Sequence, residues 1–210
     1  MSADQERLYK VKKQDIRKTG RVLGNAFMPD PVWKEVMKDI PTEQIYSFFE
    51  GPARYGLRYG TVYASSESLE GIATWVPGNH ADMNFWRGFL SGSFISGLKI
   101  GMKNLMRMMP VFQPLETDRR KHMAGRSYIY LMVIGVAPEF QGQGYGKTLL
   151  NELIRESEAS RLPVYLETST EKNVSMYERF GFKVLDKFLH PIIDLPQWKM
   201  LREPGESNQR

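Results

Sequence analysis

SYIYLMVIGVAPEFQGQGYGKTLL, residues 127–150, is the stretch that decides the architecture of this chain. It opens with an apolar run rich in Tyr, Ile and Val, which predicts a buried strand. The strand is expected to end at Val136, because Pro138 lacks the amide that a sheet requires. A glycine-dense loop follows, and a helical pattern starts near Lys147. The sequence therefore predicts a strand, a glycine loop and a helix in direct succession.

A loop in this position is suited to hold a phosphate group. Glycines let the backbone approach a phosphate closely, and the first N–H groups of the following helix point at it. The helix dipole favours negative charge at the same end. We therefore expect a cofactor that carries phosphate.

The glycine spacing separates three kinds of phosphate loop. A Walker loop needs four residues between its first glycine and Gly-Lys-Thr, whereas three lie between Gly142 and Gly146. A dinucleotide fingerprint needs G-x-G-x-x-G in a first βαβ unit, whereas these glycines are evenly spaced and late in the chain. The pattern Gln141-x-x-Gly144-x-Gly146 after Gly-Val-Ala-Pro instead resembles the pyrophosphate loop of the GCN5-related N-acetyltransferase (GNAT) family, which binds acetyl-coenzyme A.

A second motif lies in the predicted helix EKNVSMYERF, residues 171–180. Asn173 and Tyr177 are four residues apart, so both project from one helix face. They match the family's Asn-x-x-x-Tyr, and the family's Gly-Phe follows at Gly181. Together with GVAPEFQGQGYG, LETS and a terminal QWKM, this motif most resembles the puromycin N-acetyltransferase branch. The resemblance is firm over about residues 127–202.

The resemblance implies an α/β fold of the GNAT type, in a single domain over residues 1–210. We expect a central twisted mixed sheet of six to seven strands flanked by helices. Helical patterns precede a strand hairpin at residues 61–77, and strands are expected at 8–12, 163–169, 182–189 and 197–202.

A helical insertion, about residues 77–126, separates the third expected strand from the central one. The segment at 85–110 predicts two amphipathic helices. We favour a pair packed on the sheet as a wall of the substrate site over a pair lying on a membrane surface. The charged run at 118–121 is expected in a solvated loop.

The resemblance implies the residues that bind the cofactor. Backbone amides at Ile134, Gly135 and Val136 would pair with the pantetheine arm like an added strand. Asn173 would bond the amide-bearing arm, with helix capping as the alternative. The pyrophosphate loop would comprise Gln141, Gly142, Gln143, Gly144, Tyr145, Gly146, Lys147 and Thr148.

The implied reaction is attack of a neutral amine on the acetyl thioester in a ternary complex. Tyr177 is the expected acid, because a phenol pKa of about 10 and a thiol pKa of about 8.5 are close enough for assistance. A tyrosine of the core is the alternative. Glu167 is the candidate base, because a carboxylate in an apolar strand is costly unless it is paired or used. A buried structural hydrogen bond and a water relay remain open.

Aromatic residues of the first half could form an acceptor pocket, although core packing is favoured for most of them. The set comprises Tyr46, Phe49, Trp75, Phe85 and Trp86.

Composition excludes several classes of protein. The 210 residues are 41% apolar, which is enough for a core, and contain no Cys for a disulfide or a nucleophile. His80, His122 and His190 lack metal-ligand spacing, so no metal is expected; His80 is expected in an exposed loop, with a place in the acceptor pocket as the alternative. The net charge of +5 is scattered and does not predict a nucleic-acid partner. With a polar N-terminus and no apolar run of about 18 residues, we expect a soluble cytoplasmic protein with no membrane partner.

The sequence thus predicts an enzyme that transfers acetyl from acetyl-coenzyme A to a primary amine of a small molecule, as a monomer or a homodimer. Two alternatives are a protein N-terminal or lysine acetyltransferase and a non-catalytic acyl-coenzyme A sensor.

Overall fold

The computed structural model describes residues 8–205; the polar segment 1–7 and the predicted tail beyond Gly205 lie outside them. Its centre is a seven-stranded sheet with the order β1-β2-β3-β4-β5-β7-β6. β4 and β5 pair in parallel, and every other neighbouring pair is antiparallel. This confirms the predicted mixed α/β fold. The strands are β1 (Tyr9–Lys10), β2 (Thr61–Ala64), β3 (Gly71–Pro77), β4 (Ile129–Val136), β5 (Val164–Thr168), β6 (Lys183–Leu189) and β7 (Pro196–Arg202).

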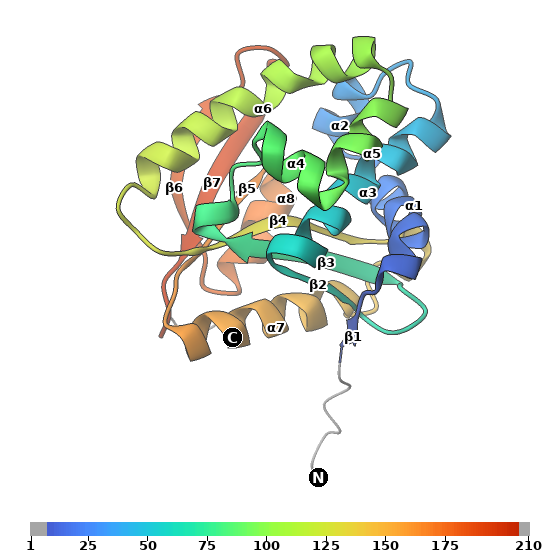
Figure 1. Ribbon diagram of the computed structural model, residues 1–210. Helices are drawn as coiled ribbons and strands as arrows, with labels where there is room; N and C mark the ends of the chain where they lie inside the picture. Colours follow the sequence, from blue (N-terminus) through green and yellow to red (C-terminus); the bar gives the residue numbers. More distant parts are fainter. Residues whose placement is uncertain (1–7, 206–210) are drawn as a thin grey trace.

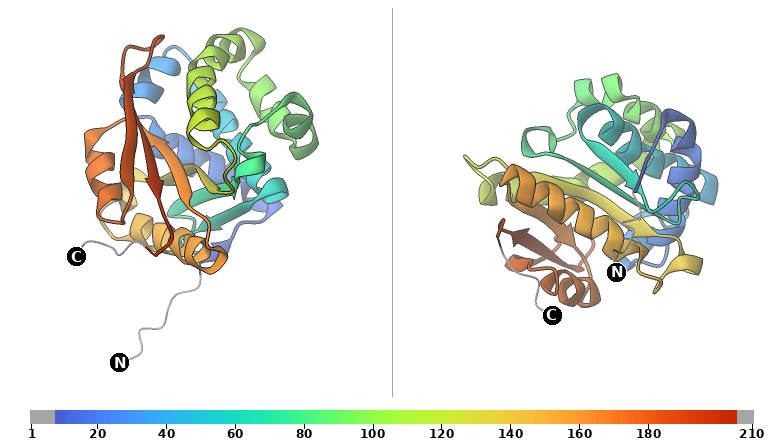
Figure 2. Two further views of the ribbon diagram at one scale, coloured as in Figure 1. Left: turned by 90° about the vertical axis from the view of Figure 1, so that its left-hand side faces the viewer. Right: turned by 90° about the horizontal axis from the view of Figure 1, so that it is seen from below.

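Helices cover both faces of the sheet (Figure 1). One face packs against α1, α3 and α6, where Leu23, Phe49 and Met108 share a core with the strands. The other face packs against α7 and α8 through residues such as Leu149 and Val174; the view from below in Figure 2 shows α7 lying across it. The helices are η1 (Lys13–Asp15), α1 (Ile16–Phe27), α2 (Pro31–Val36), α3 (Thr42–Tyr59), η2 (Gly78–His80), α4 (Phe85–Ser91), α5 (Ser93–Lys99), α6 (Met102–His122), η3 (Pro138–Phe140), α7 (Tyr145–Ser160) and α8 (Glu171–Glu178).

The insertion between β3 and β4 contains three α-helices, α4, α5 and α6, rather than the predicted two. Gly92 separates α4 from α5 with a φ of 78°, a conformation that glycine adopts without strain. α6 continues through Pro110 and Pro114, so the charged run at 118–121 is helical and not a loop. Burial of Val111 and ion pairs further along α6 offset the backbone hydrogen bonds that the prolines remove.

β4 carries a bulge at Met132. Opposite β3, Thr74 pairs with Val133 and Trp75 with Leu131, so Met132 is left without a partner in that ladder. The alternation of side chains reverses there: Leu131 packs on the α7 side, whereas Val133 packs on the α1 side. The bulge therefore lets one strand serve both layers.

Membrane-spanning structure can be assessed for residues 8–205. None of the helices in that range combines the length and the apolar character needed to cross a bilayer.

Candidate active site

A gap opens in the middle of the sheet, beside the bulge. β4 and β5 pair only at Ile129 with Val164 and at Tyr130 with Tyr165. Within the described chain no strand lies along this edge of β4 from Leu131 onward. Backbone N–H and C=O groups need partners, so such an edge can accept an extended ligand.

The loop after β4 has the backbone geometry that anion binding requires. Gly142 has a φ of 80° and Gly144 a φ of 92°, both strained for other residues. Gly144 is the N-cap of α7. The first backbone hydrogen bond of the helix runs from Thr148 N, the donor, to Gly144 O at 3.0 Å. The amides from Tyr145 to Lys147 precede that bond and are free to meet an anion.

Two glutamine side chains hold this loop in place. Gln141 donates from Nε2 to Val136 O at 3.0 Å, and Gln143 donates from Nε2 to Glu139 O at 3.3 Å. The two side chains therefore fix the shape of the loop, and in a phosphate site they would act through that shape.

The three β4 residues that were predicted to pair with the pantetheine arm do not all face the gap. Ile134 lines a cavity in the gap. Gly135 faces α1 instead, where an added Cβ would lie 2.9 Å from Ala26 Cβ, so its glycine allows close packing of helix and sheet. Val136 leads from the gap to the loop and accepts the bond from Gln141.

The α8 motif points its two residues into the gap. Thr170 caps the helix, its Oγ1 accepting from Asn173 N at 3.3 Å, so the alternative in which Asn173 is the cap is wrong. Tyr177 is 6% exposed and packs against Phe182. Its hydroxyl makes no hydrogen bond within residues 8–205, and burial raises the pKa of Tyr177 well above its ordinary value. The phenol is therefore a neutral group available to a ligand.

Both α8 side chains line a cavity of about 180 Å³ between β4 and β5. The same cavity brings in Ile134 and Glu167, so four predicted residues from three elements meet there. Further walls come from segments far apart in the chain. They include Phe27, Asp30, Trp33, Phe112, Leu115, Tyr130, Ser169, His190 and Gln197.

Glu167 is held by a buried arginine. Arg119, on α6 and 3% exposed, donates from Nη1 to Glu167 Oε1 at 3.2 Å and from Nη2 to Asp82 Oδ1 at 2.9 Å. Its guanidinium lies 4.3 Å from the centre of the Tyr130 ring. Burial raises the pKa of Glu167, and the charge of Arg119 offsets part of that rise. The expectation of a solvated run at 118–121 is therefore wrong for Arg119, because ion pairing with two carboxylates compensates its burial.

Residues 115–184 match the family model of the acetyltransferase (GNAT) domain. Over 212 residues the chain is 29% identical to an uncharacterised N-acetyltransferase of Schizosaccharomyces pombe, a match that spans 93% of this chain and 82% of the relative. Residues 115–184 thus carry a GNAT acetyltransferase domain, as the sequence predicted. This acetyltransferase is therefore an acyltransferase enzyme, as predicted, and its narrower likeness to the puromycin branch stays a prediction.

Solved structures share the GNAT fold at low identity. The C-terminal condensation domain of Ebony, in complex with beta-alanyl-dopamine, has a TM-score of 0.69 at 8% identity and covers 94% of this chain and 98% of its own. A structure described as histone acetyltransferase HPA2 and related acetyltransferase, from Corynebacterium glutamicum, has a TM-score of 0.61 at 19% identity, with 96% and 98% covered. At these identities the likeness supports the fold alone.

His190 ties the connection between β6 and β7 of the acetyltransferase to α6. Its Nδ1 accepts from Ile192 N at 3.2 Å, which leaves Nε2 to donate to Val111 O at 2.8 Å. The imidazole is therefore a neutral structural group at the wall of the cavity. Within residues 8–205 there is no group of three or more His, Asp or Glu side chains that could hold a metal ion.

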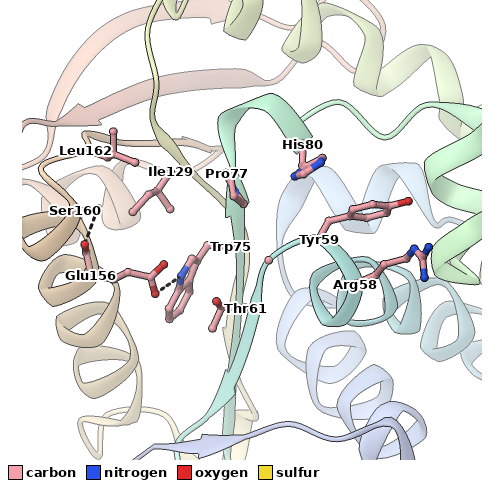
Figure 3. Close-up of a pocket in the computed structure, with 11 residues that line it drawn as sticks. Arg58, Tyr59, Thr61, Trp75, Pro77, His80, Ile129, Glu156, Ser160 and Leu162 are labelled. Atoms are coloured by element: carbon pink, nitrogen blue, oxygen red, sulfur yellow. Dashed lines mark hydrogen bonds between the residues drawn. The ribbon is translucent and has the colours of Figure 1, made fainter.

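A larger hollow of about 440 Å³ lies where α3 and α7 end (Figure 3). Trp75 lies in it and donates from Nε1 to Glu156 Oε2 at 2.9 Å. His80 lines it too, with its ring 5.0 Å from that of Tyr59, and so does not line the cavity of Tyr177. This hollow contains none of the residues predicted to bind cofactor or to catalyse.

The predicted aromatic acceptor pocket is not formed. Phe49 belongs to the core, as favoured, whereas Phe85 and Trp86 are 60% and 69% exposed. Because α4 rests against α3 rather than over the gap, its aromatic side chains point to solvent. The aromatic wall of the GNAT cavity comes instead from α1, α2 and α6, through Phe27, Trp33 and Phe112.

Arg119 is one of the residues of the candidate site that sequence reasoning missed. It lies seven residues after Phe112 and four after Leu115, so the three share one helix face, and the other two line the cavity. That periodicity continues through two prolines and could have revealed the inward position of the arginine.

Proposed function

We propose that this acetyltransferase moves an acetyl group from acetyl-coenzyme A to a primary amine of a small molecule, by direct attack in a ternary complex. The observation that carries the proposal is the single cavity that gathers Asn173, Tyr177 and Glu167 beside the open edge of β4. Bound acetyl-coenzyme A supplies the thioester.

The residues along the gap suit that cofactor. Gly142 and Gly144 shape a loop whose following helix offers free amides to the pyrophosphate. The open edge of β4 offers backbone groups to an extended pantetheine arm. Asn173 lines the cavity, and its side chain has no hydrogen bond among the described residues, so its amide is available to the same arm.

Tyr177 acts as the acid in this proposal. Its buried hydroxyl has a raised pKa and no protein partner in the described chain, so it is neutral and carries a proton to donate. The same apolar surroundings raise the pKa of the departing thiol, so Tyr177 Oη donates a hydrogen bond to the sulfur as the C–S bond breaks and its proton passes to the thiolate.

Glu167 acts as the base in this proposal, directly or through water. Its Oε atoms draw the ammonium form of the acceptor into the cavity and take its proton. A raised pKa makes this carboxylate a stronger base than an exposed glutamate. Arg119 fixes its orientation with the 3.2 Å ion pair.

The size and lining of the cavity favour a small acceptor. Its volume of about 180 Å³ is below the roughly 300–1,000 Å³ of sites for drug-sized ligands. Aromatic walls at Trp33 and Phe112, with carboxylates at Asp30 and Glu167, suit a compact cation that has an apolar part. The complex of the Ebony domain with beta-alanyl-dopamine, a small molecule, supports an acceptor of this class on the same fold.

An amine panel with release of free thiol as the readout tests the proposal, using aminonucleosides, polyamines, aminoglycosides and short peptides. We expect turnover with a small amine, and Tyr177→Phe should lower kcat by about 100-fold with little change in the Kd of coenzyme A. Turnover with peptides alone would show a protein acetyltransferase. Binding of coenzyme A without turnover of any amine would show a sensor.

A further inference from the structure

The insertion carries an exposed apolar surface, which we call the α4–α6 surface (residues 83–109). Of the fifteen large apolar side chains that are exposed in the described residues, ten lie in this segment. Trp86 and Met106 are the most open, at 69% and 67% exposed. Single exposed apolar residues are common, whereas a cluster of this kind marks a surface that binds something.

Packing within the molecule does not account for this surface. The inner side of the insertion is already in contact with α3, where Ser93 Oγ donates to Gly51 O at 2.8 Å. Ile100 and Met108 are buried in the core. The helices are thus apolar on their inner and their outer sides, whereas a helix at the surface of a water-soluble protein has a polar outer side.

The charge of the segment identifies its partner. Residues 83–115 contain Arg87, Lys99, Lys103 and Arg107 but no Asp or Glu. Lys99 pairs with Glu50 of α3 at 3.4 Å, so the positive charge offered to a partner comes from the other three residues. Basic residues around exposed aromatic and aliphatic side chains match a membrane surface, where anionic headgroups lie above acyl chains. Two copies of this chain would bring the same positive charges together, which disfavours a dimer through this surface.

We propose that the α4–α6 surface docks onto the surface of an anionic lipid bilayer, with Trp86 and Phe89 among the side chains that enter it. The helices lie on the bilayer and do not cross it. Figure 1 shows the insertion on the side of the sheet opposite to α7, so docking leaves α7 and its N-terminal loop away from the lipid. This binding is independent of the acceptor and goes against the expectation of no membrane partner.

Vesicle sedimentation with the full chain tests the proposal. Vesicles of phosphatidylcholine with about 30% phosphatidylserine should bind the chain, and binding should fall as salt is added, because charge contributes to it. The double variant Trp86→Ala with Phe89→Ala should lose at least about tenfold in partition coefficient, because two large apolar side chains no longer enter the bilayer. Lys103→Glu reverses the charge of an exposed side chain and should lower the partition coefficient at least about fivefold. Because this loss is electrostatic, it should be seen only with vesicles that contain phosphatidylserine.

A matched control comes from the edge of the sheet. Leu185 and Leu189 of β6 are 40% and 61% exposed but lie outside the insertion, so Leu185→Ala with Leu189→Ala should keep full binding. Melting temperatures and thiol release without vesicles show whether each variant is folded. If the Trp86 and Phe89 double variant does not fold, Lys103→Glu tests the proposal in its place. Absence of binding to anionic vesicles, or equal loss in both double variants, would overturn the proposal. So would a stable dimer that the Trp86 and Phe89 changes dissociate without any vesicle binding.

Discussion

The two walls of the cavity at Tyr177 are built in different ways. The wall that we propose for the cofactor, here the cofactor wall, comprises β4, the glycine loop and α8; it comes from a nearly continuous stretch, residues 129–178, and depends on backbone conformation. The wall that we propose for the acceptor, here the acceptor wall, comes from three separate segments, at residues 27–36, 111–115 and 190–197, and depends on side chains. A shared cofactor can be bound by a shared backbone, whereas an acceptor needs side chains of its own. The family motif therefore marks the first wall and leaves the second unmarked.

Arg119 links the two walls through its ion pair with Glu167. Arg119→Met leaves the buried Glu167 without its ion-pair partner and takes one of two arginines from the half-buried Asp82, and we expect a loss of about 3–5 kcal/mol in the free energy of unfolding. Denaturant unfolding measures it. Arg120→Met is the matched control, since Arg120 also pairs with Asp82, at 2.7 Å, but is 63% exposed and should cost less than about 1 kcal/mol. Equal costs for both variants would mean that the buried network does not stabilise the site.

Backbone dependence of the cofactor wall can be tested at Gly144. Gly144→Ala forces a side chain into a φ of 92°, which costs about 1–2 kcal/mol and should weaken coenzyme A binding by roughly tenfold. Gly125→Ala introduces a similar strain, at a φ of 71°, in the loop before β4 and away from the gap. It should lower the melting temperature without changing the Kd of coenzyme A. Calorimetric titration of both variants with coenzyme A decides whether the affinity falls only when the strain is in the glycine loop or also when it is elsewhere in the chain.

Side-chain dependence of the acceptor wall can be tested at Phe112. Phe112→Ala removes an aromatic surface from the cavity and should raise the KM of the acceptor about tenfold, because apolar contacts of this size contribute about 1–3 kcal/mol. The KM of acetyl-coenzyme A should stay the same. Phe89→Ala, an exposed phenylalanine of the insertion, should change neither value in the absence of lipid. A change in the KM of both substrates for Phe112→Ala would show that the two walls are not separable.

The smallest expected effect is in the pH profile. Burial raises the pKa of Glu167, so the carboxylate that accepts the proton is populated at higher pH than for an exposed glutamate. The acidic limb of kcat should therefore lie above pH 4.5, the ordinary value, and should be absent in Glu167→Gln. Because the pKa is raised on folding, ionisation of Glu167 lowers the stability as the pH rises through it. An acidic limb that survives in Glu167→Gln would assign the base to a water relay.

Much of the cofactor wall could be predicted from the sequence because its determinants are local. Glycine spacing reports positive φ angles at Gly142 and Gly144, and a spacing of four places Asn173 and Tyr177 on one helix face. The acceptor wall could not be predicted, since Asp30, Phe112 and His190 meet only through tertiary folding. The position of Arg119 could not be predicted for the same reason. A charged run in the sequence does not show that Glu167 on β5 and Asp82 before α4 lie within reach of the arginine.

The bulge at Met132 gives β4 the properties of two short strands joined by one residue. Deletion of Met132 would join Leu131 directly to Val133, and both would keep their partners Trp75 and Thr74 on β3. Gly135 would also keep its place against Ala26, so the packing of α1 on the sheet should survive the deletion. What would be lost is the local bend that a bulge gives a strand, next to the cavity that Met132 lines. Shortening β4 by this one residue is therefore expected to impair the cavity more than the stability of the fold.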